Sequence, residues 1–248
     1  MQHPHRQHLT YRHALGALAL GVSLAFGSAQ AGPQAADHTA AQQASASNGA
    51  ALAAAQRDLS TFINQLLQQR AGSPLADFPL DVKDVSELKD ARIGYGFPVY
   101  TIDPDKILGA KGKMKDMARH ANQWRFVVMA GERPVGMATV ERQNGRFETV
   151  AYGAAVLSKD LDRLVAQHGN ADRSNLRLVR IYQARSDLLE VSGVGGSARF
   201  APLLSARTSL SMAKGTVNDA KAVAPLLDDA EILPALRVAV KGNLDQHR

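Results

Sequence analysis

The sequence contains no cysteine at all. This absence excludes disulfide bonds, thiolate metal sites, thiol nucleophiles and the lipid-attachment site of a bacterial lipoprotein. Aromatic residues are also scarce, at 5% of the chain, and acidic residues are interleaved with basic ones. Proteins that bind nucleic acid usually combine a strongly basic face with aromatic or arginine platforms, so this composition argues against a nucleic-acid partner.

The first residues of the chain have the pattern of a secretory leader. Residues 1–13 are basic and free of acids, residues 14–27 are apolar, and residues 28–31 supply the small side chains that a signal peptidase needs. The apolar stretch is shorter than the roughly 20 residues of a membrane-spanning helix, which favours cleavage over anchoring. We therefore predict a signal peptide at 1–31, a periplasmic or secreted location, and no transmembrane segment after cleavage.

The mature chain is predicted to be mildly basic and to contain one folded domain. Loss of Arg6 and Arg12 with the leader leaves 27 basic against 23 acidic residues, a net charge of +4. Residues 32–49 are rich in Ala, Gln and Ser without apolar periodicity, which predicts a flexible spacer. Residues 50–248 are enough for a single α+β domain with one sizeable core.

One long amphipathic helix is predicted directly after the spacer. Its apolar positions recur at three- and four-residue intervals, as one face of a helix requires. They are Leu52, Ala55, Leu59, Phe62, Ile63, Leu66 and Leu67. Gly72 and Pro74 are expected to end this helix, and its apolar face is expected to pack against a sheet of the same domain.

The clearest β region is a three-stranded meander at residues 123–130, 135–141 and 147–152. Asn144-Gly145 joins the last two strands, and this dipeptide favours a tight hairpin because both turn positions need positive φ. A preceding strand is predicted at residues 91–102, where Pro98 indicates a sheet edge or a bulge.

The rest of the chain predicts further helices and a second hairpin. Ser158 is expected to cap a helix, and Asn218 to cap a C-terminal helical region. Strands are predicted at residues 176–184 and 188–191, around a tight turn. The fold class is therefore α+β: a single antiparallel sheet (meander plus hairpin), with the long N-terminal helix and the other helices packed on one face. No motif assigns the chain to a family.

The domain lacks an assembled set of catalytic residues in its sequence. Apart from His247 in the C-terminal tail, only His120 and His168 lie inside it, too few for a zinc site that needs three or four ligands. Residues 211–214 fit the S-x-x-K string of penicillin-recognising enzymes, but the companion elements are missing. Acid pairs such as Asp187 and Glu190 are commonplace on loops. We predict no catalytic residues, no metal and no cofactor.

Two groups of residues are candidates for binding a ligand or partner. Lys111, Lys113 and Lys115 belong to a basic, glycine-containing segment that could meet an acidic partner, a phospholipid surface or an anionic envelope polymer, although a solvated loop has the same composition. Arg180 and Tyr182 lie on one face of the strand at 176–184, and an arginine there usually pairs with a carboxylate or a ligand.

These observations lead to one main functional hypothesis and two alternatives. The main hypothesis is an exported, non-enzymatic binding module that engages a protein or peptide partner, in the manner of an inhibitor or immunity factor. The first alternative is a carrier of a small apolar ligand, with its cavity between the long helix and the sheet. The second is a hydrolase of a class that leaves no local motif.

Overall fold

The computed structural model describes residues 33–69, 78–109, 112–212 and 225–246. The predicted signal peptide lies outside these ranges. The chain divides into two compact units, Met1–Ala40 and Ala41–Arg248, and the architecture below is that of the second. Within the described ranges, no helix combines the length and the hydropathy of a membrane span.

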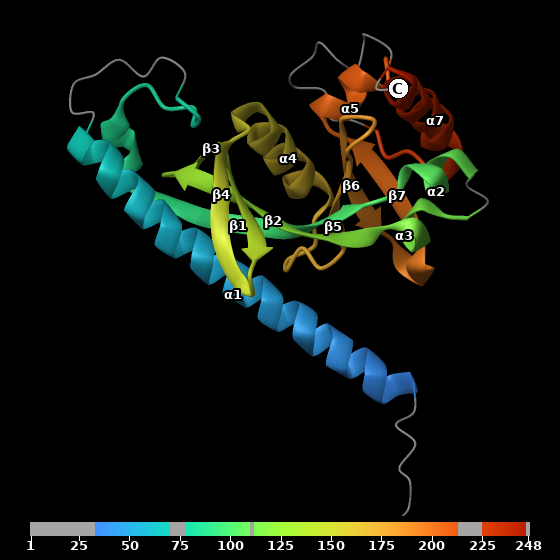
Figure 1. Cartoon of the computed structure of the whole chain (residues 1–248), viewed down its shortest axis with the longest axis horizontal. Helices are drawn as coiled ribbons and strands as arrows, with labels where there is room; N and C mark the ends of the chain where they lie inside the picture. Colours follow the sequence, from blue (N-terminus) through green and yellow to red (C-terminus); the bar gives the residue numbers. More distant parts are fainter. Residues whose placement is uncertain (1–32, 70–77, 110–111, 213–224, 247–248) are drawn as a thin grey trace, which may run out of the picture. The chain divides into compact units, whose positions relative to one another are not determined.

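A single seven-stranded sheet organises the fold (Figure 1), with strand order β4-β3-β2-β1-β5-β6-β7. The strands are β1 (Ala91–Thr101), β2 (Arg119–Ala130), β3 (Arg133–Gln143), β4 (Arg146–Gly153), β5 (Leu176–Ile181), β6 (Ser186–Ser192) and β7 (Ala198–Pro202). The α+β content and the meander β2-β3-β4 are confirmed. The prediction of a purely antiparallel sheet is wrong, because β1 and β5 pair in parallel, with Val99 opposite Leu178.

The helices of the structure are α1 (Pro33–Gln69), η1 (Val85–Leu88), α2 (Pro104–Gly109), α3 (Met114–Met117), α4 (Ala155–His168), η2 (Val194–Gly196), α5 (Leu204–Ser209) and α7 (Asp229–Asp245). The helix α1 begins inside the stretch 32–49 that the sequence predicts as a flexible spacer. Asn48 in that stretch even contacts the sheet, since its Oδ1 accepts a 2.8 Å hydrogen bond from Trp124 Nε1. The structure thus has residues 33–49 in helix α1, where the sequence predicts a spacer.

Helix α1 covers one face of the meander. Of the apolar positions predicted from its periodicity, Ala55, Leu59 and Ile63 are buried against strand residues of β1, β2 and β3, and the other predicted positions pack there partly buried. Ala51 and Ala54, which the prediction leaves out, are buried there as well. Side chains of the helix also form hydrogen bonds with the backbone of the edge strand β4. Asp58 Oδ2 accepts from Thr149 N at 2.7 Å, and Arg57 Nη2 donates to Phe147 O at 3.2 Å. These backbone groups are then not free to pair with another strand.

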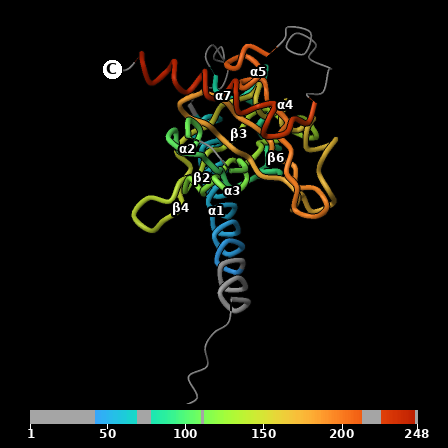
Figure 2. Tube along the Cα trace, turned by 90° about the vertical axis from the view of Figure 1, so that its right-hand side faces the viewer, coloured from blue at the N-terminus to red at the C-terminus, as the bar shows by residue number. Residues whose placement is uncertain are grey.

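Helices cover both faces of the sheet, contrary to the prediction of one covered face. On β2, Phe126 packs in the cluster under α1, whereas Val127 packs with Leu161 and Leu164 of α4 on the other face. Figure 1 shows α1 and α4 on opposite sides of the meander. Toward β7, α5 and α7 lie close together in both Figure 1 and Figure 2 and share a third cluster, which includes Phe200.

The tertiary structure bears on three local predictions. Of the two alternatives for Pro98, the bulge fits and the edge does not, since β1 is central and Pro98 lies beside a register shift in its pairing with β2. Ser158 lies inside α4, where its Oγ donates to Ala155 O, and the N-cap position is Ala154 in a left-handed conformation. Asn218 lies outside the described residues, and the C-terminal helix α7 is capped by Asp228.

Gly96 is a position where the sheet tolerates no side chain, and it provides a first testable prediction. A Cβ on Gly96 would lie 2.2 Å from Phe126 Cδ1 and 2.7 Å from Arg125 O. Gly96→Ala should therefore lower the free energy of unfolding by about 3 kcal/mol, measured by urea denaturation. Gly242→Ala is the control, because a Cβ there meets nothing within 4 Å inside a helix, so this change should be neutral or slightly stabilising.

Candidate functional site

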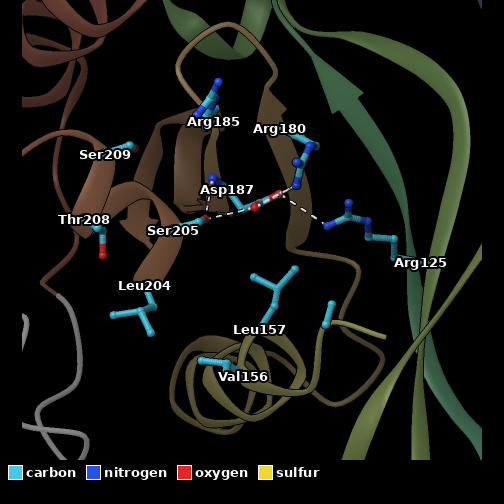
Figure 3. Close-up of a pocket in the computed structure, with 11 residues that line it drawn as sticks. Arg125, Val156, Leu157, Arg180, Arg185, Asp187, Leu204, Ser205, Thr208 and Ser209 are labelled. Carbon is cyan, nitrogen blue, oxygen red and sulfur yellow. Dashed lines mark hydrogen bonds and ion pairs between the residues drawn. The ribbon is translucent and has the colours of Figure 1, made fainter. Parts of the chain in front are cut away.

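A pocket of about 660 Å³ opens on the same face of the sheet as α4 (Figure 3). Side chains from β2, β5, β6, the β5–β6 turn, the first turn of α4 and the short helix α5 line it. They are Arg125, Ala154, Val156, Leu157, Arg180, Arg185, Asp187, Leu204, Ser205, Thr208 and Ser209. Because β1 lies between β2 and β5, only the folded sheet brings these residues together.

One side of the pocket is built around the carboxylate of Asp187. Asp187 and Arg180 are direct cross-strand partners, and Arg180 Nη1 lies 2.9 Å from both carboxylate oxygens. Arg125 Nη1 reaches the same carboxylate at 3.4 Å. Ser205 locks the group from α5, since its Oγ donates to Asp187 Oδ2 at 2.9 Å and accepts from Asp187 N at 3.0 Å. The carboxylate is thus held in place by two other strands and one helix.

Positive charge exceeds negative charge in this pocket. Three arginines line it against the single carboxylate of Asp187, and Arg185 has no partner among the described residues. The Nε atoms of Arg125 and Arg180 are buried, again without a hydrogen-bond partner in the described part of the chain. Burial lowers the pKa of Arg125 from its usual value, the neighbouring Arg180 lowers it further, and Asp187 opposes both effects. The three arginines therefore carry more N–H donors than Asp187 accepts from, which favours the binding of an anion.

The other side of the pocket is apolar. Figure 3 shows Val156, Leu157 and Leu204 gathered below the charged groups. Val156 is 62% exposed although it is a large aliphatic side chain. The first turn of α4 begins at this wall, and its N-cap residue Ala154 makes no side-chain capping bond. The positive end of the helix dipole therefore adds to the arginine charge.

Helix α5 is fixed at the pocket by a buried ion pair behind it. Asp160 of α4 accepts from the backbone N of Leu204 at 2.6 Å and from Arg207 Nη2 at 3.2 Å. Arg207 Nη1 donates in turn to Pro202 O at 2.8 Å. Asp160 and Arg207 are only 4% and 5% exposed. This pair positions Leu204 and Ser205 without itself lining the pocket.

The structure unites only some of the residues that the sequence singled out. Arg180 lies in the pocket, and Tyr182 lies in the turn after β5, with the Arg180 guanidinium 5.4 Å from its ring. Lys111 lies outside the described residues. Lys113 precedes α3 and Lys115 lies within it, where its Nζ donates to Gly196 O. Neither of these two lysines lines the pocket.

The sequence alone does not predict the remaining residues of the pocket. Arg125, Arg185 and Ser205 belong to separate elements, and no spacing along the chain connects them. Asp187 was noted only as half of an acid pair with Glu190. Both of these carboxylates are buried, and each pairs with an arginine directly across the hairpin, Asp187 with Arg180 and Glu190 with Arg177. The sequence does contain one indication of this site: the spacing of the two arginines on β5 matches the spacing of the two acidic residues on β6.

His120 and His168 lie on separate elements, β2 and α4. His120 stacks among aromatic rings, 4.7 Å from Trp124, and burial lowers its pKa. His168 ends α4, and burial together with Arg199 lowers its pKa. Across the described ranges, no group of three His, Asp or Glu side chains could hold a metal ion.

A second, more polar pocket of about 420 Å³ lies elsewhere on the sheet. Tyr95 donates from its hydroxyl to Asp162 Oδ1 at 2.9 Å, and Arg173 lies over the Tyr95 ring. Burial raises the pKa of Tyr95, and the Asp162 charge raises it further. Arg92 and Glu132 also line this pocket, so its cationic and acidic groups balance. It has no surplus of charge like that of the first pocket.

Comparison with protein-family models, with curated proteins and with solved structures finds no match to this chain.

Proposed function

We propose that this protein is an exported, non-enzymatic binding module that engages a protein or peptide partner through the arginine pocket. The observation that carries the proposal is the surplus of three guanidinium groups over one carboxylate, beside an apolar wall. The ligand that fits has an acidic group next to an apolar side chain. We assign the periplasm or the exterior of the cell as its location, on the basis of the leader-like residues 1–31.

Charge and solvation both support an anionic ligand. Neighbouring guanidinium groups repel one another, and a carboxylate that enters the pocket relieves this repulsion and accepts hydrogen bonds from exposed guanidinium N–H groups such as those of Arg185. The apolar wall of Val156, Leu157 and Leu204 then contacts a neighbouring aliphatic group of the ligand. An acidic side chain within a peptide, flanked by an apolar residue, meets both requirements.

The two serine hydroxyl groups of the pocket support binding rather than catalysis. Ser205 Oγ both donates to Asp187 and accepts from its backbone. Ser209 Oγ lies 2.7 Å from Ser186 Oγ. Each of these hydroxyl groups is thus engaged in holding the fold, whereas a serine nucleophile requires an adjacent general base that is free to take its proton.

Titration with a matched pair of peptides tests the proposal. We expect acetyl-Leu-Ala-Glu-Ala-Leu-amide to bind at least about tenfold more tightly than its Gln twin in isothermal calorimetry, because only the Glu peptide is charged. Arg185→Gln should remove this preference, whereas Arg146→Gln, an exposed arginine on β4, should preserve it. Equal binding of the two peptides, or an unchanged preference in Arg185→Gln, would contradict the proposal.

The size of the pocket favours one alternative, a carrier of a small apolar ligand. A volume of about 660 Å³ is within the usual range for small-molecule sites. Its position differs from the one predicted, because the interface between α1 and the sheet is filled by core side chains. Octanoate is the probe for this alternative. If octanoate binds more tightly than the Glu peptide, the protein is a carrier of a small ligand and the peptide-binding proposal is wrong.

A further inference from the structure

We infer that the arginine pocket continues past Arg185 into a neighbouring pocket, and that the two together hold an extended peptide segment with an acidic residue in its middle. This inference rests on the proposed function and identifies the form of the partner. The neighbouring pocket has a volume of about 210 Å³ and is lined by Tyr182, Gln183, Arg185, Asn243 and Leu244. Arg185 lines both pockets, so one side chain borders each of them.

The shared wall is a rigid turn rather than a loose loop. Arg185 N donates to Tyr182 O at 3.0 Å, and Arg185 has a left-handed backbone with φ of 52°. The Arg180 guanidinium packs over the Tyr182 ring. From the C-terminal helix, Asn243 Nδ2 donates to Gln183 O at 2.6 Å and ties α7 to the turn. The backbone of the turn is therefore held in place, and it carries Arg185 and Tyr182, both exposed.

The neighbouring pocket has the groups that bind a peptide main chain. The side-chain amide of Gln183 and the Oδ1 atom of Asn243 have no hydrogen-bond partner among the described residues. Side-chain amides both donate and accept, as a peptide unit does. Tyr182, at 42% exposed, and Leu244 add a surface for an apolar side chain.

The order of chemistry along the combined groove specifies the occupant. An apolar wall at α4 is followed by the arginines, and then by amides and an aromatic ring. An extended peptide advances about 3.3 Å per residue, so a segment anchored by its carboxylate places its neighbours on both sides of the arginines. A single small acid would occupy only the first pocket. The charge and the two-sided contact together favour an acidic peptide over a small ligand.

Peptide length separates this inference from the proposed function. The long probe is acetyl-Leu-Ala-Glu-Ala-Leu-amide, and the short probes are its two halves, acetyl-Leu-Ala-Glu-amide and acetyl-Glu-Ala-Leu-amide. We expect the long probe to bind at least about tenfold more tightly than either half. Gln183→Ala should weaken the long probe several-fold and leave the tighter short probe unchanged. Tyr182→Ala should weaken the long probe more than the short one, because the Arg180 guanidinium lies over the Tyr182 ring. Unchanged binding of the short probe also shows that Gln183→Ala keeps its fold.

Two results would overturn the inference in different ways. If Arg185→Gln weakens all probes while Gln183→Ala and Tyr182→Ala leave the long probe unaffected, the arginine pocket binds alone and the groove is wrong. If Arg185→Gln weakens no probe, the proposed function fails, and the inference fails with it. The Arg146→Gln protein serves as the charge-matched control in each titration.

Discussion

Asp187→Asn is expected to destabilise the protein and, at the same time, to strengthen its binding of anions. The Asp187 side chain is 3% exposed and pairs with Arg180 and Arg125, whose side chains are 27% and 13% exposed. Removal of one partner from a buried ion pair leaves uncompensated charge and typically costs about 3–5 kcal/mol. Since Arg180 retains some contact with water, we expect a loss near the lower limit, about 3 kcal/mol.

Two measurements check this prediction. It is specific because stability should fall while peptide affinity rises. Urea denaturation should show the loss of stability, and Asp90→Asn, at an exposed position with the same change of charge, should show almost none. Calorimetry should show tighter binding of the Glu peptide to Asp187→Asn, because the competing carboxylate has been removed from the arginines. If the variant is as stable as the original protein, or binds the peptide more weakly, then Asp187 does not neutralise the arginine charge in the pocket.

The local elements of the fold were predictable because their signals lie within short stretches of sequence. The apolar positions from Leu52 to Leu67 identify the buried face of α1, and Asn144-Gly145 identifies the turn between β3 and β4. Asn144 and Gly145 indeed have φ of 50° and 82°, as such a turn requires.

The pairing of distant strands was not predictable in the same way. After the meander, α4 carries the chain back from the edge strand β4 to the middle of the sheet, where β5 joins β1 in parallel. Nothing in the residues of β5 specifies that partner, because β5 has apolar residues on both faces. The same crossover places Pro98 in a central strand.

The site depends on this crossover more than on any motif. Arg180 could be singled out because a strand rarely carries an arginine on its buried face without a partner. Its partners come from three other elements, and the parallel pairing is what places β5 within reach of Arg125 on β2. The lysine-rich segment near α3 is a weaker indication of a site. A chain with a net positive composition contains such segments whether or not it binds a ligand there.

Asp160→Ala is the second substitution for which we expect a large effect, about 4 kcal/mol of stability. It removes the acceptor for Leu204 N, the first free donor of α5, and leaves the buried Arg207 without its anion. Arg207→Met should cost less, about 2 kcal/mol, because Asp160 retains Arg163, at 3.3 Å, and the Leu204 backbone.

The double variant Asp160→Ala/Arg207→Met separates the ion pair from the helix cap. If the loss in Asp160→Ala arises mainly from the stranded guanidinium of Arg207, a neutral methionine relieves it, and the double variant should be at least as stable as Asp160→Ala alone. Urea denaturation of the four proteins gives this coupling energy. Strictly additive losses would mean that the cap on Leu204 N dominates. In either case the amide hydrogens of α5 should exchange faster in Asp160→Ala, since Asp160 anchors the helix that carries Ser205 to the pocket.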